Sequence, residues 1–107
     1  RCCNEDNHGA TEPPTVEVDS HRSAASWCGA RNTAGNVWEW CTDWDKSDDY
    51  EEAPPTNPKG PESGAVRVLR GGAWHDGPVD CRGANRIFCG PAFSVDRNGF
   101  RVASNVE

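Results

Sequence analysis

Residues 66–103 alternate short apolar runs with segments that contain glycine and proline, and this alternation limits the possible folds more than any other feature. The apolar runs have the length and composition of short strands. Two intervening segments, 75–80 and 87–96, each contain a Gly-Pro pair, which is incompatible with a regular helix or a central strand. We therefore expect a frame of short strands that presents two irregular inserts.

The expected frame has three main pieces. Residues 66–74 are predicted to form a strand that bends at Gly71-Gly72, where glycine permits positive φ. Asn98-Gly99 is typical of a turn, and residues 100–103 after it alternate like a strand. The run 32–45, with three tryptophans, predicts an aromatic strand.

The remaining segments are expected to be simpler. Val16 and Val18 alternate with polar residues, which indicates at most one short edge strand. Residues 21–30 allow a turn or two of helix that ends at Gly29. The acidic segment 46–65 is rich in proline and glycine and has no periodicity, so we expect an irregular connection.

The core has few aliphatic residues available. Leu69 is the only leucine and Ile87 the only isoleucine, and Leu, Ile, Val and Phe together lie below the roughly 20% that usually separates folded from disordered chains. The five tryptophans argue against disorder, because each can bury on the order of 150–250 Å². With 107 residues, residues 1–107 are expected to form one small domain with a mainly aromatic core.

Charge and hydropathy argue against two classes of partner. The net charge is −6 and Lys and Arg are not clustered, so a nucleic-acid surface is not expected. The sequence has no long apolar run and no signal-type segment, so nothing in it indicates membrane insertion. It starts with Arg1, which leaves open whether a further N-terminal domain precedes it.

Six cysteines in so small a domain are typical of a disulfide framework if the protein is secreted. Cys41 and Cys81 are expected to lie close together because both belong to the frame, and Cys89 is expected to be unpaired within its insert. No Cys-x-x-Cys pair is present, so a zinc site is a weak interpretation. Adjacent Cys2 and Cys3 fit a frayed terminus better than a metal site.

Glu39 stands between Trp38 and Trp40 in the aromatic run. Burying a carboxylate costs several kcal/mol unless it is paired or binds a metal, so a buried Glu39 needs a partner. Strict alternation along a strand also allows Glu39 to point outward while the tryptophans point inward.

Over residues 32–103 the chain resembles the C-terminal part of the formylglycine-generating-enzyme (sulfatase-modifying factor) family. The similarity is carried by the runs GNVWEWCTDW, NPKGPESGAVRVLRGGAW, CRGANR and NGFRVA, whereas residues 1–31 match poorly. The resemblance implies an α+β fold of the C-type lectin type, with a small twisted antiparallel sheet and much irregular loop.

The family's enzyme oxidises a substrate cysteine with a cysteine pair and copper. By resemblance, the first cysteine position holds Asp76 and the second falls at Cys81, although CRGANR also matches a structural cysteine of the family. Copper(I) needs soft thiolate ligands, and with Asp76 at the first position one of the two implied thiolates is missing. We therefore expect no copper and no enzymatic activity of this type.

The last third of the chain resembles more closely the variable proteins of diversity-generating retroelements, which use the same fold without catalysis. Adenine-directed mutagenesis in those proteins varies a restricted set of residues on a fixed frame. The inserts 75–80 and 87–96 contain only residue types compatible with that set and lack Lys, Glu and Trp. The alternative is an ordinary lectin-like domain with arbitrary loops.

This resemblance predicts a non-catalytic display module whose hypervariable surface binds a protein or other macromolecule, with a cell or virion surface as the suspected location. Preorganised loops lose little entropy on binding, so few contacts give useful affinity. The alternatives are a divergent or inactive sulfatase-modifying-factor domain and a purely structural virion or surface module. The predicted binding residues are His75, Asp76, Val79, Asp80, Ile87, Phe88, Phe93, Val95 and Asp96.

The family's enzymes hold a calcium ion at an Asn-x-x-Gly-Asn-x-Trp-Glu stretch, which this chain keeps from Asn32 to Glu39. By position, the implied ligands are the Asn32 side chain, the Gly35 and Val37 carbonyls and the Glu39 carboxylate, all of them oxygen donors as calcium prefers. The alternative is an ion pair between Glu39 and an arginine such as Arg86 or Arg101. Both arrangements would explain a partly buried Glu39.

Overall fold

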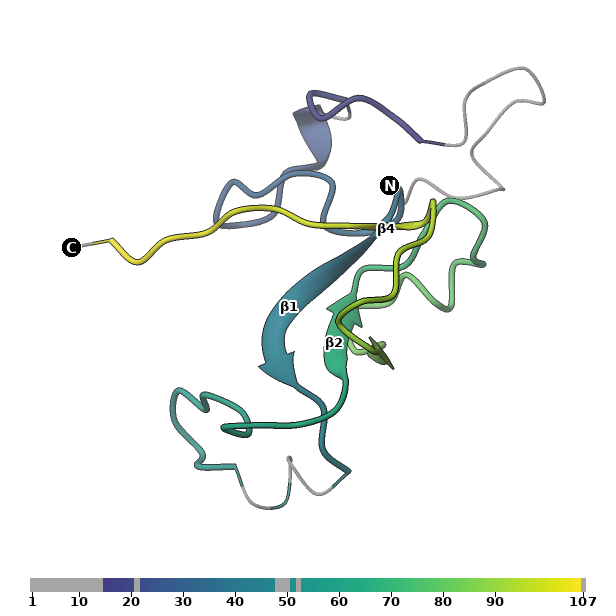
Figure 1. Ribbon diagram of the computed structural model, residues 1–107. Coiled ribbons are helices and arrows are strands. Elements are labelled where there is room, and N and C mark those ends of the chain that lie inside the picture. The colour runs from purple at the N-terminus through teal and green to yellow at the C-terminus, as the bar shows by residue number, and fades with distance from the viewer. Residues whose placement is uncertain (1–14, 21, 48–50, 52, 107) are drawn as a thin grey trace.

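The computed structural model describes residues 15–20, 22–47, 51 and 53–106. One sheet has the strand order β3-β2-β1-β4. The strands are β1 (Trp38–Trp44), β2 (Arg67–Arg70), β3 (Ile87–Cys89) and β4 (Asn98–Gly99), and the 3-10 turn η2 (Arg22–Ala24) precedes them. Figure 1 shows the connection between β1 and β2 below the sheet and the N-terminal segment above it.

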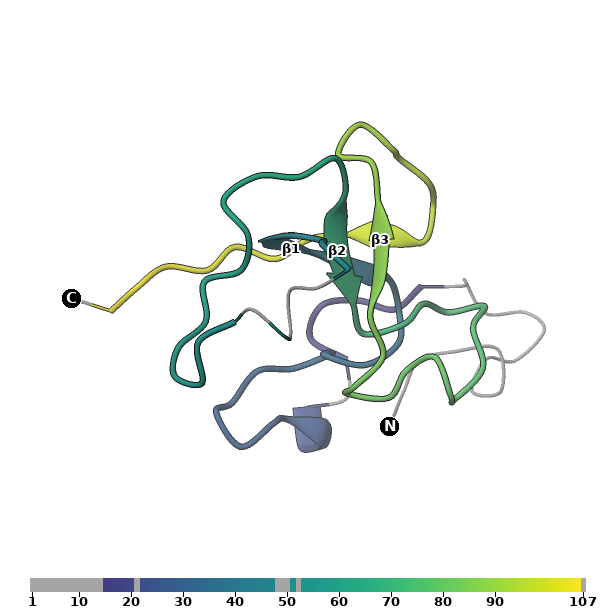
Figure 2. The ribbon, with the colours of Figure 1, turned by 90° about the horizontal axis from the view of Figure 1, so that it is seen from below.

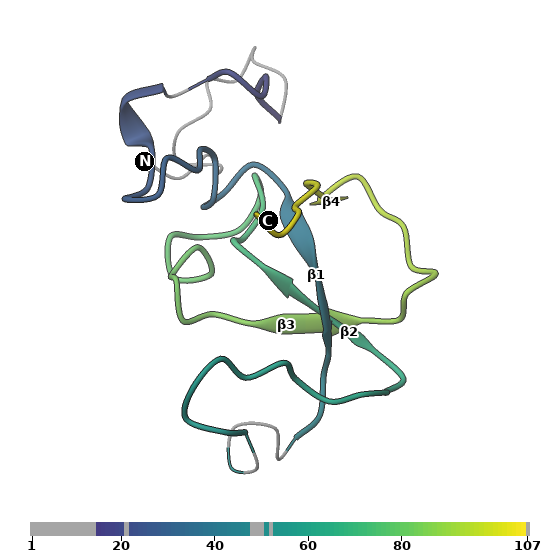
Figure 3. The same cartoon turned by 90° about the vertical axis from the view of Figure 1, so that its left-hand side faces the viewer.

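The sheet is mixed and strongly twisted. β2 pairs antiparallel with both β1 and β3, as expected, whereas β4 pairs parallel with β1 through Trp38–Asn98 and Glu39–Gly99. The prediction of an antiparallel sheet is therefore wrong for the last strand. Figure 3 shows the twist, because β3 runs crosswise to β1.

The core lies on the face of the sheet that carries Leu69. Leu69 and Ala73 are fully buried and Trp38 is 4% exposed, and Trp40, Ile87 and Cys89 pack against this cluster. Within β1 and within β3 the core residues are separated by one residue, which places them on the same face. The core is therefore mixed rather than mainly aromatic.

The tryptophans differ in burial, which limits how far the core is aromatic. Trp38 is buried, but Trp27 is 99% exposed. Trp44 is half-buried and stacks under Arg67, whose Cζ lies 3.9 Å from the ring centroid. The guanidinium of Arg67 also donates to the carbonyl of Thr42, so this cation–π contact holds the end of β1 against β2.

The end of the chain differs from its prediction. Asn98-Gly99 is strand β4 and not a turn, and the turn lies just before it at Asp96-Arg97. A Cβ at Gly99 would lie 2.8 Å from Val37 Cγ2, so the close approach of β4 to the chain before β1 requires glycine here. Residues 100–103 form no strand, and their apolar side chains are exposed.

The second insert also begins inside the frame. Residues 87–89 form β3, where Ile87 pairs with Leu69 and Phe88 with Val68. Pairing with a buried strand explains why this run is regular despite its glycine-proline break at 90–91. The irregular part of the insert is therefore residues 90–96.

The N-terminal expectations are confirmed only in part. Val16 and Val18 are not in a strand, and the backbone N–H of Val16 donates instead to Asn36 Oδ1 at 3.0 Å. The expected helix is limited to η2. A separate turn follows in which the Ser26 amide donates to the Ala30 carbonyl at 2.8 Å and Gly29 has a φ of 84°.

Gly71 and Gly72 end β2 at the predicted bend, with φ values of 100° and 78°. A Cβ on Gly72 would lie 2.7 Å from Cys81 Sγ and 3.2 Å from the Asp80 carbonyl oxygen. Positive φ and this close approach both exclude a side chain, so Gly72 fixes where the first insert returns to the sheet.

We predict that Gly72→Ala lowers the free energy of unfolding by about 2–4 kcal/mol, because a positive φ costs about 1–2 kcal/mol and overpacking adds about 1–3 kcal/mol. Gly77→Ala is the matched control, since a Cβ at Gly77 would meet nothing within 4 Å and the φ of this residue is not positive. Urea unfolding of both variants checks this, and equal midpoints would contradict it.

Candidate functional site

The first insert is anchored at its start by Asp76. The backbone N–H of Trp74 donates to the Asn36 carbonyl at 2.8 Å, and Asp76 Oδ2 accepts from the Ala73 amide at 2.9 Å. Ala73 is fully buried, so the Asp76 carboxylate turns back onto the core instead of facing solvent. The Asp76 side chain therefore has a structural role in closing this turn.

Cys81 ends the first insert in the core. Its side chain is buried, with Sγ against the backbone of Gly72. The two positions implied for a copper-binding pair thus hold a carboxylate bonded to a backbone amide and a buried thiol. This donor set does not fit copper(I), which takes soft thiolate ligands. Among the described residues, no three His, Cys, Asp or Glu side chains are grouped so as to hold a metal.

His75 connects the first insert to the segment that leads into β4. Its Nε2 lies 3.2 Å from Arg97 Nη1, and its Nδ1 lies 3.2 Å from Asp76 Oδ1. A guanidinium only donates, so Nε2 accepts and the proton of neutral His75 is on Nδ1. The Arg97 carbonyl accepts from the Trp38 amide at 2.7 Å, which links His75 to the start of β1.

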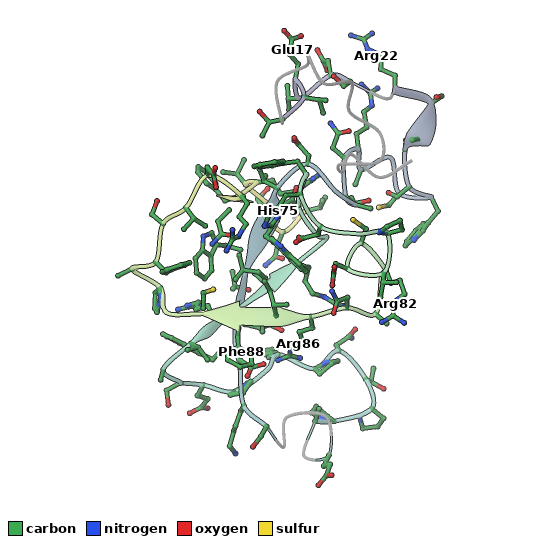
Figure 4. The ribbon with its side chains drawn as sticks, turned by 90° about the vertical axis from the view of Figure 1, so that its right-hand side faces the viewer. Glu17, Arg22, His75, Arg82, Arg86 and Phe88 are labelled. Atoms are coloured by element: carbon green, nitrogen blue, oxygen red, sulfur yellow. The ribbon has the colours of Figure 1, made fainter. Side chains whose placement is uncertain are left out.

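The predicted binding residues do not form one surface. Figures 2 and 3 show the two inserts at opposite ends of β3, and Figure 4 shows His75 on one side of β3 and Phe88 on the other. Ile87 is half-buried and packs on the core cluster, because it pairs with buried Leu69.

The other members divide by exposure. Val79, Phe88 and Phe93 are 64%, 59% and 50% exposed. Asp80 and Val95 are half-buried, and their carbonyls accept hydrogen bonds from Asn85 and Asn98 within their own loops. Asp96 is exposed in the turn before β4. The exposed apolar side chains of the predicted set are therefore Val79, Phe88 and Phe93, which lie apart from one another.

Glu39 is paired with Arg101. Arg101 Nε donates to Glu39 Oε2 at 2.7 Å and Nη2 donates to Oε1. The structure thus contains the ion pair that the sequence left open, with Arg101 and not Arg86 as the partner. Arg86 pairs with Asp45 instead, and its Nη2 lies 3.2 Å from Asp45 Oδ1. The calcium ligands predicted at Asn32, Gly35, Val37 and Glu39 stay a prediction.

Sequence reasoning missed Arg97, the partner of His75. The two residues lie 22 positions apart, His75 in the first insert and Arg97 just after the second, so no local pattern connects them. It also missed the carbonyls of Arg31 and Asn32, which accept from Arg101. Backbone acceptors carry no residue-type signal, so only the fold could reveal them.

The described cysteines are Cys28, Cys41, Cys81 and Cys89, and no disulfide joins any two of them. The predicted proximity of Cys41 and Cys81 stays a prediction. Burial raises the pKa of the Cys41 thiol, and the nearby Asp43 carboxylate adds to this. The Ser26 hydroxyl, 3.2 Å from Cys28 Sγ, lowers the pKa of the exposed Cys28 thiol, with a further contribution from the Ala30 amide.

Within the described part of the chain, no helix has the length and apolar character needed to cross a bilayer.

Comparison with known proteins gives a consistent result. The model of the family described as "Sulfatase-modifying factor enzyme 1-like domain" matches residues 4–106. A formylglycine-generating enzyme of Streptomyces coelicolor is 43% identical over 106 residues, which cover 96% of this chain and 32% of that protein. The serine/threonine-protein kinase pkn1 of Chlamydia pneumoniae is 44% identical over 81 residues, and the formylglycine-generating enzyme of Mus musculus is 41% identical over 80. The chain therefore spans about a third or less of the length of these relatives.

The opposite pKa shifts of Cys28 and Cys41 predict different alkylation profiles. A lowered pKa gives more thiolate at a given pH, so iodoacetamide should modify Cys28 with a midpoint below that of an ordinary cysteine and Cys41 with a midpoint above it. Peptide mass spectrometry after short pulses across a pH series measures both curves. The chain in concentrated urea is the reference, where the two midpoints should coincide. A native Cys41 midpoint at or below that of Cys28 would contradict the assignment.

Proposed function

Because the chain belongs to the family of sulfatase-modifying factor enzyme 1-like domains, we propose that it is a divergent domain of this family that lacks copper-dependent cysteine oxidation. The small curled sheet with little helix agrees with this family. A C-type lectin-like arrangement of the sheet and loops is part of the same proposal.

One observation carries the proposal. The position implied for the first copper-binding cysteine holds Asp76, and the side chain of Asp76 is part of the hydrogen bonding that stabilises the fold. Its Oδ2 accepts from the amide of buried Ala73 at 2.9 Å. A carboxylate is a hard ligand, and this one already satisfies a buried donor, so it cannot stand in for a thiolate. Cys81, at the second position, is buried against Gly72. Two soft ligands therefore do not face a common site.

We predict that the purified protein forms no aldehyde from a cysteine-containing peptide in the presence of copper(I) and oxygen. A hydrazide reagent and mass spectrometry of the peptide detect the product. The Streptomyces coelicolor enzyme, assayed alongside, shows that the conditions support turnover. Copper-dependent aldehyde formation by this chain, at any rate that Cys81→Ser abolishes, would refute the proposal.

The second candidate function is the display module that binds a macromolecule. The observation in its favour is the exposure of Val79, Phe88 and Phe93, three large apolar side chains in or beside the inserts. Large apolar groups that are solvent-exposed contribute little to the fold and are available to a partner. Since they lie at separate positions, a single compact epitope would use only one end of β3.

This candidate predicts that the three positions tolerate replacement. Val79→Ser, Phe88→Ser and Phe93→Ser should each change the free energy of unfolding by about 0.5 kcal/mol or less, as for surface substitutions. Leu69→Ala is the buried control and should lose about 2–5 kcal/mol. Thermal unfolding followed by circular dichroism compares the four variants.

If Phe88→Ser or Phe93→Ser lowered the free energy of unfolding as much as Leu69→Ala does, these side chains would belong to the fold and not to a binding surface. At the level of the gene, a near-copy repeat with adenines at the codons of residues 75–80 and 90–96 would favour the retroelement variable proteins. A flanking sequence without such a repeat would favour the divergent domain alone.

A further inference from the structure

Arg101 occupies a group of oxygen atoms that we call the oxygen cradle, which consists of the Glu39 carboxylate and the backbone carbonyls of Arg31 and Asn32. Arg101 Nε lies 2.7 Å from Glu39 Oε2, Nη1 lies 2.8 Å from the Arg31 oxygen and Nη2 lies 3.1 Å from the Asn32 oxygen. Nη2 also donates to Glu39 Oε1. All three guanidinium nitrogens are therefore used, and the carboxylate is bound through both oxygens.

The geometry suits a guanidinium better than a spherical ion. A guanidinium is planar and presents its donors in a fixed fork, which matches a carboxylate on one edge and two carbonyls on the others. A guanidinium is not deprotonated in proteins, so Arg101 brings a permanent positive charge to the cradle.

The cradle is preorganised by the loop before β1. Asn32, Gly35 and Asn36 all have positive φ, at 53°, 77° and 71°. The Asn32 side-chain amide donates to the Val18 carbonyl at 2.9 Å, and the Gly35 amide donates to the Gly71 carbonyl at 2.7 Å. These bonds, together with that from Val16 to Asn36, hold the two carbonyls in place on several sides.

The oxygen cradle shares the Glu39 carboxylate with the four residues implied as calcium ligands, and these four do not fit calcium while Arg101 is bound to Glu39. Calcium takes six to eight oxygen ligands, several of them charged in a tight site. Glu39 is the only carboxylate among the four residues implied as ligands, and both of its oxygens are bonded to Arg101. One carboxylate and one guanidinium leave no net negative charge, and two cations a few ångströms apart repel each other.

We propose that the oxygen cradle is a guanidinium site filled by Arg101, which takes the place of the structural calcium implied by the family resemblance. Arg101 is the second residue after β4, so its side chain ties the end of the last strand to the loop before β1. In Figure 1 the C-terminal segment runs alongside the chain that leads into β1, in agreement with these bonds. The expected result is a domain whose stability depends on Arg101 and not on calcium.

The first test uses the unmodified protein. Its Tm should be the same in excess EDTA and in millimolar calcium chloride, because no bound calcium contributes to the native state. A Tm that falls in EDTA and recovers with calcium would overturn the proposal, whatever the variants show.

The second test removes the guanidinium. Arg101→Ala should lower the Tm by about 5–10 °C, and Arg101→Lys should recover only part of this, because an ammonium keeps the charge but loses the planar fork. Low millimolar methylguanidinium should raise the Tm of Arg101→Ala, and calcium should not. Arg22→Ala is the matched control, since Arg22 is exposed in η2 and its contact with Asp19, at 3.6 Å, is itself exposed.

Two results would refute the assignment. If Arg101→Ala had the same Tm as Arg22→Ala, the hydrogen bonds of Arg101 to the oxygen cradle would contribute nothing measurable to stability. An Arg101→Ala variant restored by calcium and not by methylguanidinium would show that the cradle is a cation site of the calcium type. If Arg101→Ala does not fold, Arg101→Lys and the EDTA comparison on the unmodified protein still decide the question.

Discussion

The fold depends on β2, a four-residue strand that is hydrogen-bonded on both sides and buried on both faces. Leu69 is fully buried and faces Trp40 across one strand pair and Ile87 across the other. Val68 points to the opposite face and is also buried. With only one leucine and one isoleucine in the chain, these two residues meet at the centre of the sheet. The rest of the domain is arranged around this contact, because few other aliphatic side chains are available to form a second core.

Arginine side chains hold several segments of the chain to this small core. Arg97 reaches His75, Arg101 reaches the oxygen cradle, and Arg67 covers Trp44. In each pair an arginine joins two segments that are distant in sequence. Arginine suits this task because its fork can satisfy several carbonyl or carboxylate oxygens at once while its stem packs on apolar surface. A chain short of aliphatic residues can thus organise long loops with charged ones.

Features set by local chemistry were predictable from the sequence. The bend at Gly71-Gly72 follows from the need for positive φ, and the Gly-Pro breaks correctly marked irregular loop. Features set by distant partners were not. Three residues, 87–89, are too few to show a period, and the buried strand opposite makes them β3. Asn98-Gly99 has the composition of a turn, but parallel pairing with Trp38 and Glu39 overrides that preference.

At the candidate site, the need of Glu39 for a partner was evident from the sequence, and the identity of that partner was not. The contact between Glu39 and Arg101 spans 62 residues, and the parallel pairing of β4 with β1 closes a loop of similar length. Bringing such distant segments together costs chain entropy before any contact compensates for it. The β1–β2–β3 meander can form by nearer pairings, whereas the β1–β4 edge has to wait for the whole intervening chain. We therefore expect the docking of residues 98–101 to be a late step in folding, during which the edge of β1 stays unpaired and open to other chains.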